Sequence, residues 1–191
     1  TEALDEWHRR ADGTCTANYA FHMAIADWNE QAKADMQVMR DAGVMSFKTY
    51  FAYDHLRLDD AQTLEVLEYI RDIADARINI VHLSSALGLE AVRAAKARGK
   101  VKMDVETCPQ YLLLDDSRYL ESDFEGAKYV MSPPLRKQHD IEVLRRAVCD
   151  GEIDTIATDH CSFNLHGQKD RGIDDFTHIP NGGPGVEHRP G

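Results

Sequence analysis

The protein has 191 residues, a formal net charge of −11 at pH 7 and a pI near 5.2. Hydrophobic residues make up 43% of the sequence, which is normal for a globular protein and sufficient for one substantial core. An acidic chain is not attracted to nucleic-acid phosphates or to anionic membrane surfaces, so we expect neither partner. No apolar stretch approaches the roughly 20 residues that a membrane-spanning helix requires.

The four cysteines lie far apart in the sequence, and no CxxC pair occurs. This spacing favours reduced thiols over a disulfide framework or a structural zinc knuckle. The first six residues are acidic and polar, which is not typical of a signal peptide. We therefore expect a cytoplasmic protein.

Helices and strands are predicted to alternate along the first half of the chain. Asp12 and Gly13 end a first helix, and Gly43 follows a second at the position where glycine commonly ends helices. Asp59 and Asp60 open a third helix, whose leucines and isoleucines recur with helical spacing. The predicted helices cover 2–11, 29–42, 59–76 and a stretch from Ser84 or Ser85 to 97; the predicted strands cover 18–26 and the runs that end at Lys48 and His82.

The second half continues the alternation and then loses it. Strands are predicted over 101–106, over 128–131 and in the run that ends at Asp159, with a helix over 141–149. A strand and a helix recurring in units of roughly 25 to 35 residues are typical of a parallel sheet or barrel. Glycines and prolines punctuate the segment 162–191, and loops of this length are usually functional or disordered.

Three apolar runs end in residues that can hold a metal ion, namely Lys48, His82 and Asp159. In a barrel of alternating strands and helices, the carboxyl ends of the strands converge on one face, where the chemistry takes place. One polar residue at a strand end is ordinary. A lysine, a histidine and an aspartate in this role within one chain indicate an active site.

Lys48 has the most distinctive chemistry of the three. Burial at the end of an apolar strand lowers the pKa of a lysine, and a neutral amine reacts with carbon dioxide. The resulting carbamate is a carboxylate that can bridge two metal ions. The alternative is a lysine that extends to the surface or pairs with an acid.

His82 is a suitable zinc ligand, and Asp159 can ligate a metal or act as a general base. The alternatives are a core histidine with satisfied hydrogen bonds and, for Asp159 with His160, a helix-cap pair. Cys108 and Cys161 have no obvious base beside them, so we interpret both as packing residues. His160 is a candidate for a hydrogen bond near the site.

Six short segments, spread over nearly the whole chain, form a recognisable series: 46–53 (SFKTYFAY), 81–85 (VHLSS), 106–112 (ETCPQYL), 131–136 (MSPPLR), 158–161 (TDHC) and 179–182 (IPNG). In these segments and in their order, the sequence resembles the dihydropyrimidinase/D-hydantoinase family of cyclic amidohydrolases. The resemblance implies an α/β fold, the metal-dependent (β/α)8 TIM-type barrel. It also implies two zinc ions, with manganese or cobalt compatible with the same ligands.

The resemblance also implies a role for each site residue. Lys48, carbamylated on its side-chain nitrogen by carbon dioxide, bridges the metals, His82 ligates one of them, and Asp159 ligates one and transfers a proton. Tyr53 stabilises the developing oxyanion. Ser132 and Asn181 present main-chain groups to the ring of the substrate.

On this basis we expect a hydrolase that opens hydantoin or dihydropyrimidine rings to N-carbamoyl amino acids by means of a metal-bridging hydroxide. The alternatives are an allantoinase or dihydroorotase that acts on a related cyclic ureide, and a non-catalytic scaffold with the same fold. A homotetramer is the assembly that the family resemblance implies.

The chain also departs from the family pattern. It has no His-x-His pair, which the family carries on its first barrel strand, and only 33 residues separate Lys48 from His82. That interval has room for one helix but not for the family's further strand and histidine ligand, and the apparent join lies near 67–68. We therefore expect 1–191 to be one incomplete barrel domain without the first strand, one internal unit and the C-terminal part. Within it, 162–191 is a loop-rich substrate-binding segment. A product limited to these 191 residues is expected to be inactive, because three of six ligands cannot hold two metals.

Overall fold

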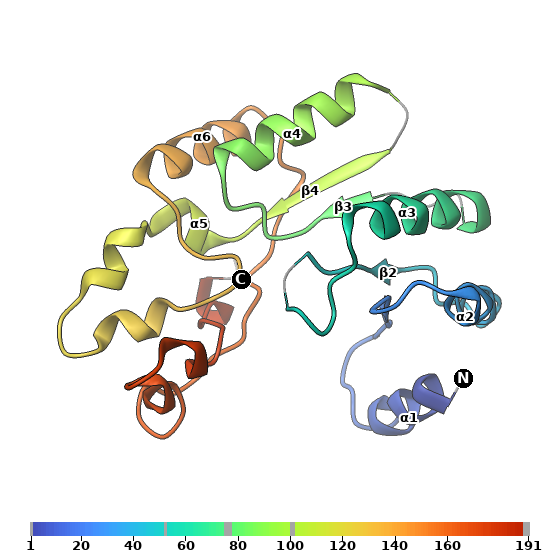
Figure 1. Ribbon diagram of the computed structural model, residues 1–191, viewed down its shortest axis with the longest axis horizontal. Coiled ribbons are helices and arrows are strands. Elements are labelled where there is room, and N and C mark those ends of the chain that lie inside the picture. Colours follow the sequence, from blue (N-terminus) through green and yellow to red (C-terminus); the bar gives the residue numbers. More distant parts are fainter. Residues whose placement is uncertain (1, 52, 75–77, 100–101, 189–191) are drawn as a thin grey trace. The chain divides into compact units, whose positions relative to one another are not determined.

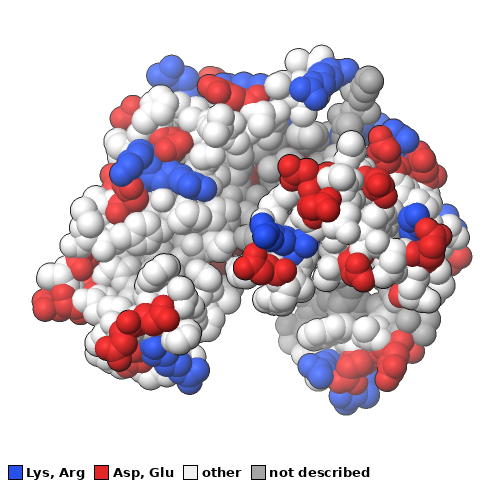
Figure 2. Space-filling view, viewed as in Figure 1, with Lys and Arg blue, Asp and Glu red and all other residues white. Residues whose placement is uncertain are grey.

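A computed structural model describes residues 2–51, 53–74, 78–99 and 102–188 of the protein (Figure 1). The chain divides into two compact units, Thr1–Ala76 and Arg77–Gly191. Both are built from helices and short parallel strands, so the fold is mixed α/β. Acidic and basic side chains are interspersed over the face seen in Figure 2.

The first unit contains one pair of parallel strands. Its elements are α1 (Glu2–Ala11), β1 (Met23–Ala24), α2 (Glu30–Asp41), β2 (Phe47–Lys48) and α3 (Asp60–Ala74). In the β1–β2 pair, Met23 lies opposite Phe47 and Ala24 opposite Lys48. Buried apolar residues form one core cluster in this unit: Ile25, Met36, Leu58 and Val66.

Local sequence sets the helix ends of this unit. The side chain of Asn29 accepts a 2.9 Å hydrogen bond from the amide of Ala32 and caps α2. Gly43 follows α2 with a φ of 91°, a left-handed conformation that glycine adopts without a steric penalty. At α3, Asp59 accepts from the amide of Gln62, and Gln62 accepts from the amide of Asp59, as in a capping box.

The second unit contains a sheet of three parallel strands in the order β3–β4–β5. Its main elements are β3 (Ile78–Ile80), α4 (Ala86–Ala97), β4 (Met103–Thr107), α5 (Pro109–Leu113), α6 (Gln138–Cys149) and β5 (Thr155–Ile156). The register places Ile78 opposite Met103, and Glu106 opposite Thr155. Short 3-10 helices occupy the loops: Asp116–Leu120, Glu125–Tyr129, Lys169–Gly172, Phe176–His178 and Val186–His188.

The core of the second unit lies between β4 and two helices, α4 and α6, which lie on the same side of the sheet (Figure 1). Val105 of β4, Leu89 of α4 and Leu144 of α6 are completely buried, and so is Cys108. Each fully buried apolar side chain contributes about 1.5–3 kcal/mol relative to an exposed one. This packing holds the ends of β3, β4 and β5 in place.

Most of the predicted helices are confirmed. The helices predicted over 2–11 and 29–42 correspond to α1 and α2. Ser85 caps α4 by accepting a hydrogen bond from the amide of Gly88, and Gly99 follows that helix with a φ of 66°. The helix predicted to reach residue 76 is described only to Ala74, and residues 75–77 and 100–101 lie outside the described residues.

The predicted strands need more correction. The strand predicted over 18–26 is limited to β1, and the one predicted over 128–131 is wrong, because 125–129 form a 3-10 helix. Close packing of Gly126 explains that turn, since an added Cβ would lie 2.6 Å from the carbonyl oxygen of Tyr119. The run before Asp159 was expected to be buried, but Ile156 is 52% exposed. Among the described strands β5 pairs with β4 alone, so it is an edge strand.

Within the described part of the chain, no helix has both the length and the apolar character needed to cross a bilayer. The prediction of one domain over 1–191, with 162–191 as its substrate-binding segment, stays a prediction.

Candidate active site

His82 and Asp159 follow two strands of the same sheet. β3 and β5 flank β4 on its two sides, and all three strands run in the same direction. Backbone hydrogen bonds continue beyond the strands, from the amide of Leu83 to the carbonyl of Glu106 (2.8 Å) and from that of Ala157 to that of Thr107 (3.0 Å). Both residues therefore lie at the carboxyl edge of the sheet, the position predicted for them.

Three of the six predicted site residues have left-handed backbone conformations. The φ angles are 69° at Tyr53, 43° at His82 and 47° at Asp159. Residues other than glycine rarely adopt this region, and such strain concentrates at functional sites. At His82 and Asp159 the chain turns shortly after the ends of β3 and β5, and Tyr53 lies in a loop.

Asp159 lies beside the end of β4. Burial, together with the negative charges of Asp159 and Glu106, raises the pKa of the Cys108 thiol to about 12. Cys108 therefore stays protonated near neutral pH and packs as a small apolar residue, as predicted. Asp159 itself is exposed and makes no hydrogen bond or ion pair with another described residue, so its carboxylate is available for a ligand.

Lys48 belongs to the first unit and ends β2, as predicted. Its side chain is exposed, so the predicted burial is wrong for this structure. The ammonium group lies 5.2 Å from the ring centroid of Tyr50, which in turn contacts the ring of Tyr53 edge-on at 6.5 Å. Tyr53 lies five residues after Lys48 in the sequence, and the Tyr53 side chain is 42% exposed.

Ser132 lies in a turn that two tyrosines hold. The Tyr111 hydroxyl donates a 2.8 Å hydrogen bond to the carbonyl of Pro133, and the Tyr119 hydroxyl accepts one of 2.8 Å from the amide of Leu135. The Ser132–Pro133 peptide bond is cis. Burial raises the pKa of both tyrosines, so both hydroxyls remain protonated and keep their hydrogen bonds.

Asn181 is exposed. The segment that contains it is hydrogen-bonded to two others, one at Val130 and one at Cys161. The amide of Gly182 donates to the carbonyl of Val130, and the amide of Cys161 donates to the carbonyl of Gly183, each at 3.0 Å. A Cβ on Gly182 would lie 2.3 Å from the Cys161 carbonyl oxygen, so only glycine permits this approach. The structure thus brings together the segments that carry Ser132, Asp159 and Asn181.

The side chain of His160 is hydrogen-bonded to the loop that contains Gly185 and Val186. Its Nδ1 accepts hydrogen bonds from the amides of Gly185 (3.0 Å) and Val186 (3.2 Å). Nδ1 therefore carries no proton in this arrangement. His160 thus makes hydrogen bonds that hold a loop, and its place near the site stays a prediction.

The donor groups are of the kind that metals of this class prefer. An imidazole and a carboxylate, from His82 and Asp159, are common zinc ligands, and a carbamate on Lys48 would add carboxylate oxygens. Among the described residues, however, no group of three histidine, cysteine or acidic side chains is close enough to hold a metal. The residues therefore fit a metal in the type of their donor groups.

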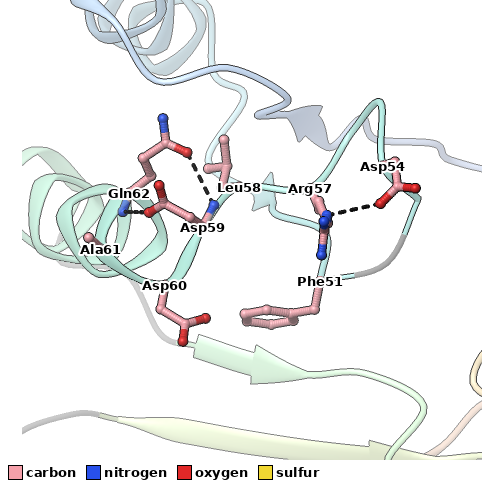
Figure 3. A pocket seen from close by; sticks show the side chains of 8 residues that line it. All are labelled: Phe51, Asp54, Arg57, Leu58, Asp59, Asp60, Ala61 and Gln62. Atoms are coloured by element: carbon pink, nitrogen blue, oxygen red, sulfur yellow. Dashed lines mark hydrogen bonds and ion pairs between the residues drawn. The ribbon is translucent and has the colours of Figure 1, made fainter.

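A hollow of about 710 Å³ lies in the first unit, next to the loop of Tyr53 (Figure 3). Phe51, Asp54 and residues 57–62 line it, and the Arg57 guanidinium lies 3.1 Å from an Asp54 carboxylate oxygen. None of the six predicted site residues lines this hollow, so we assign it no role in the predicted chemistry.

Two residues of structural importance are not predicted from the sequence. Tyr111 lies within the motif segment 106–112 without a predicted role of its own, and no pattern distinguishes Lys169, although its side chain is 1% exposed. Lys169 stands in a polar stretch, Gly167 to Asp170, that is typical of an exposed loop. No local pattern could have indicated that the chain folds over it.

Parallel strands that present an imidazole and a carboxylate at their carboxyl ends are typical of α/β enzyme scaffolds. No family model matches the chain. It is 32% identical to the D-hydantoinase of Geobacillus stearothermophilus over 98% of this chain and 52% of that protein. Among solved structures, the D-hydantoinase of Bacillus sp. AR9 and the dihydropyrimidinase of Brevibacillus agri each show a TM-score of 0.90 at 31% identity, covering 98% of this chain and 53% of theirs.

The chain is therefore a homologue of D-hydantoinases and dihydropyrimidinases along nearly its whole length, as its sequence motifs predicted. Those hydantoinases have the TIM-barrel fold of the amidohydrolases. The chain spans about half the length of the curated relatives it matches. The alignment with the Geobacillus protein covers 244 positions, so that protein has at least 53 aligned positions (244 minus 191) that this chain lacks.

Proposed function

We propose that this chain is part of a cyclic amidohydrolase that opens a hydantoin or dihydropyrimidine ring to an N-carbamoyl amino acid. The observation that carries the proposal is the identity of about 31% to D-hydantoinases along 98% of the chain. The ends of β3 and β5 support it, because they present an imidazole and a carboxylate at one edge of the sheet.

Under this proposal, Lys48, His82 and Asp159 would hold two divalent metal ions, with Lys48 as its carbamate. The ions, when bound, supply a hydroxide nucleophile near pH 7 and polarise the carbonyl group of the ring. Zinc is our proposal for both. Manganese and cobalt are compatible with the same ligands.

Asp159 is the proposed proton carrier. Its carboxylate takes a proton from the attacking water and delivers it to the ring nitrogen that leaves as the ring opens. The left-handed backbone at Asp159 turns the chain at the carboxyl edge of the sheet, and the carboxylate lies near enough to Cys108 to raise the pKa of that thiol. The carboxylate is exposed and therefore accessible to water and to a substrate.

Tyr53, Ser132 and Asn181 are the proposed substrate-binding residues. The phenol of Tyr53 would donate a hydrogen bond to the oxygen on which negative charge develops. Main-chain groups of Ser132 and Asn181 would pair with the N–H and C=O edge of the ring. Each of these two residues lies in a segment that tertiary hydrogen bonds hold, which supports a fixed recognition edge.

We also propose that the chain represents part of a (β/α)8 barrel and that the enzyme is a cytoplasmic homotetramer. The alignment positions that the chain lacks support an absent internal segment. We place it between 48 and 82, where only 33 residues separate Lys48 from His82. Mass spectrometry of the native protein tests this part of the proposal. A subunit of 21.6 kDa would contradict it, whereas a subunit about twice as heavy is expected for a decorated barrel.

The function is tested by incubating the complete, metal-loaded protein with hydantoin, dihydrouracil, allantoin and dihydroorotate. Release of the N-carbamoyl amino acid from either of the first two is the expected result. Preference for allantoin or dihydroorotate would assign the protein to the alternative ring classes. Absence of turnover with all four substrates would favour the scaffold alternative.

Matched lysine variants test the proposed metal bridge. Lys48→Ala should lose bound metal and activity together, whereas Lys33→Ala, in the same unit and on a helix, should keep both. Metal content measured by elemental analysis gives a readout independent of turnover. Full metal content in the Lys48 variant would exclude the bridging role.

A further inference from the structure

Lys169 is a buried lysine that holds two loops together. Its side chain is 1% exposed, and the ammonium nitrogen donates hydrogen bonds to the carbonyl oxygens of Val130 (2.9 Å) and Pro180 (3.1 Å). The ring of Phe163 lies 5.9 Å from the same nitrogen. Within the described residues, Lys169 has no carboxylate partner.

The two carbonyls belong to the segments that carry the proposed substrate-binding residues. Val130 is two residues before Ser132, and Pro180 immediately precedes Asn181. The Val130 carbonyl also accepts the amide of Gly182, so the ammonium group and a main-chain hydrogen bond connect the same two segments.

Such a residue is costly for the folded state. Burying an ammonium group without an anionic partner is unfavourable, and burial lowers the pKa of Lys169. An apolar side chain of similar length would avoid that cost, but it would leave the Pro180 carbonyl without its donor. The placement is best explained by what the two hydrogen bonds hold in position.

We propose that Lys169 is a positioning residue that sets the spacing between the main-chain groups of Ser132 and Asn181 that bind the ring of the substrate. This inference rests on the proposed function for the role of those two residues. Lys169 would touch neither the substrate nor the metal ions, and its effect would pass through the loops around Val130 and Pro180.

The experiment compares two substitutions of nearly equal size in the complete, metal-loaded protein. Lys169→Met removes both hydrogen bonds, whereas Lys169→Gln retains an N–H donor. For Lys169→Met we expect KM for hydantoin to rise about tenfold or more, with metal content unchanged and kcat less affected, because uniform binding is lost. Lys169→Gln should restore part of the lost affinity.

A second readout does not depend on catalysis. Hydrogen exchange of the Gly182 amide and of peptides covering 130–134 and 179–183 should accelerate together in Lys169→Met. The control is Leu144→Ala, which removes a completely buried side chain of α6, an element outside both segments, and destabilises the same unit. In this control, folded protein should keep the wild-type KM.

Each result decides between positioning and simple stability. A Lys169→Met protein with unchanged KM and unchanged exchange in both segments would overturn the proposal. Failure of both Lys169 variants to fold would also overturn it, since the lysine would then serve core stability. If the wild type hydrolyses no cyclic amide, the proposed function fails, while paired acceleration of exchange would still support the link between the loops.

Discussion

The hydroxyl group of Tyr111 donates a 2.8 Å hydrogen bond to the main-chain carbonyl of Pro133. Tyr111 is in α5, directly after β4, and Pro133 is in the turn that contains Ser132. The hydrogen bond therefore connects the carboxyl end of the central strand to a proposed substrate-binding segment. The tyrosine is 3% exposed, so its side chain is almost completely shielded from water.

Tyr111→Phe should destabilise the protein by about 0.5–1.5 kcal/mol, because it removes the hydrogen bond to the partly buried carbonyl of Pro133. It should also raise KM for the ring substrate by loosening the turn at Ser132. Urea unfolding and steady-state kinetics measure the two effects. The control is Tyr129→Phe, whose hydroxyl bonds no other described residue, and its stability should change by less than about 0.5 kcal/mol. Equal behaviour of the two variants would contradict the role of the hydrogen bond.

Gly182→Ala should reduce activity strongly, whereas Gly183→Ala should have a small effect. A Cβ at residue 182 would lie 2.3 Å from the main-chain carbonyl oxygen of Cys161, which cannot move without displacing the loop after Asp159. A Cβ at residue 183 meets only the terminal methyl of Met131 at 3.1 Å, and that flexible side chain can shift. We expect kcat/KM to fall about tenfold or more in the first variant. Similar kinetics for the two would show that the close approach at Gly182 is unimportant.

Asp159→Asn should keep the fold and lose activity. Asparagine tolerates left-handed backbone as well as aspartate does, so unfolding should occur at a similar urea concentration. The amide cannot carry the proton, and general acid–base catalysis contributes about 10²–10⁴-fold to the rate. Asp123→Asn is the matched control, because Asp123 also has a positive φ (56°) and an exposed side chain. Near-normal turnover by Asp159→Asn would exclude the proposed proton transfer.

Cys108 should make the protein less stable in alkaline solution. Its pKa is about 12 in the folded state and near 9 in the unfolded chain, so only the unfolded chain releases the proton between these values. The stabilising effect is complete below pH 9 and is lost as the pH rises toward 12. Urea unfolding at pH 8 and at pH 10.5 should therefore show a fall in stability that is smaller in Cys108→Ala. A thiol reagent at pH 8 should modify exposed Cys161 and spare Cys108 in the folded protein.

Much of the local structure could be predicted because short-range chemistry controls it. Asn29 and Ser85 cap helices through their own side chains, and Gly43 and Gly99 end helices by adopting left-handed backbone. The strand predicted over 128–131 was wrong because its local apolar pattern does not reveal how closely Gly126 packs against the carbonyl of Tyr119.

The sequence by itself determined the family resemblance, the alternation of helices and parallel strands, and the placement of His82 and Asp159 after two of those strands. These features depend on motif identity, capping residues and periodic patterns, which act over a few residues. Only the tertiary structure decided which side chains are buried. Lys48 ends an apolar strand and is exposed, whereas Lys169 stands in a polar loop and is completely enclosed. Burial depends on segments that are distant in sequence. For Lys169 these are the segments of Val130 and Pro180, and a local sequence pattern cannot predict that they pack around the lysine.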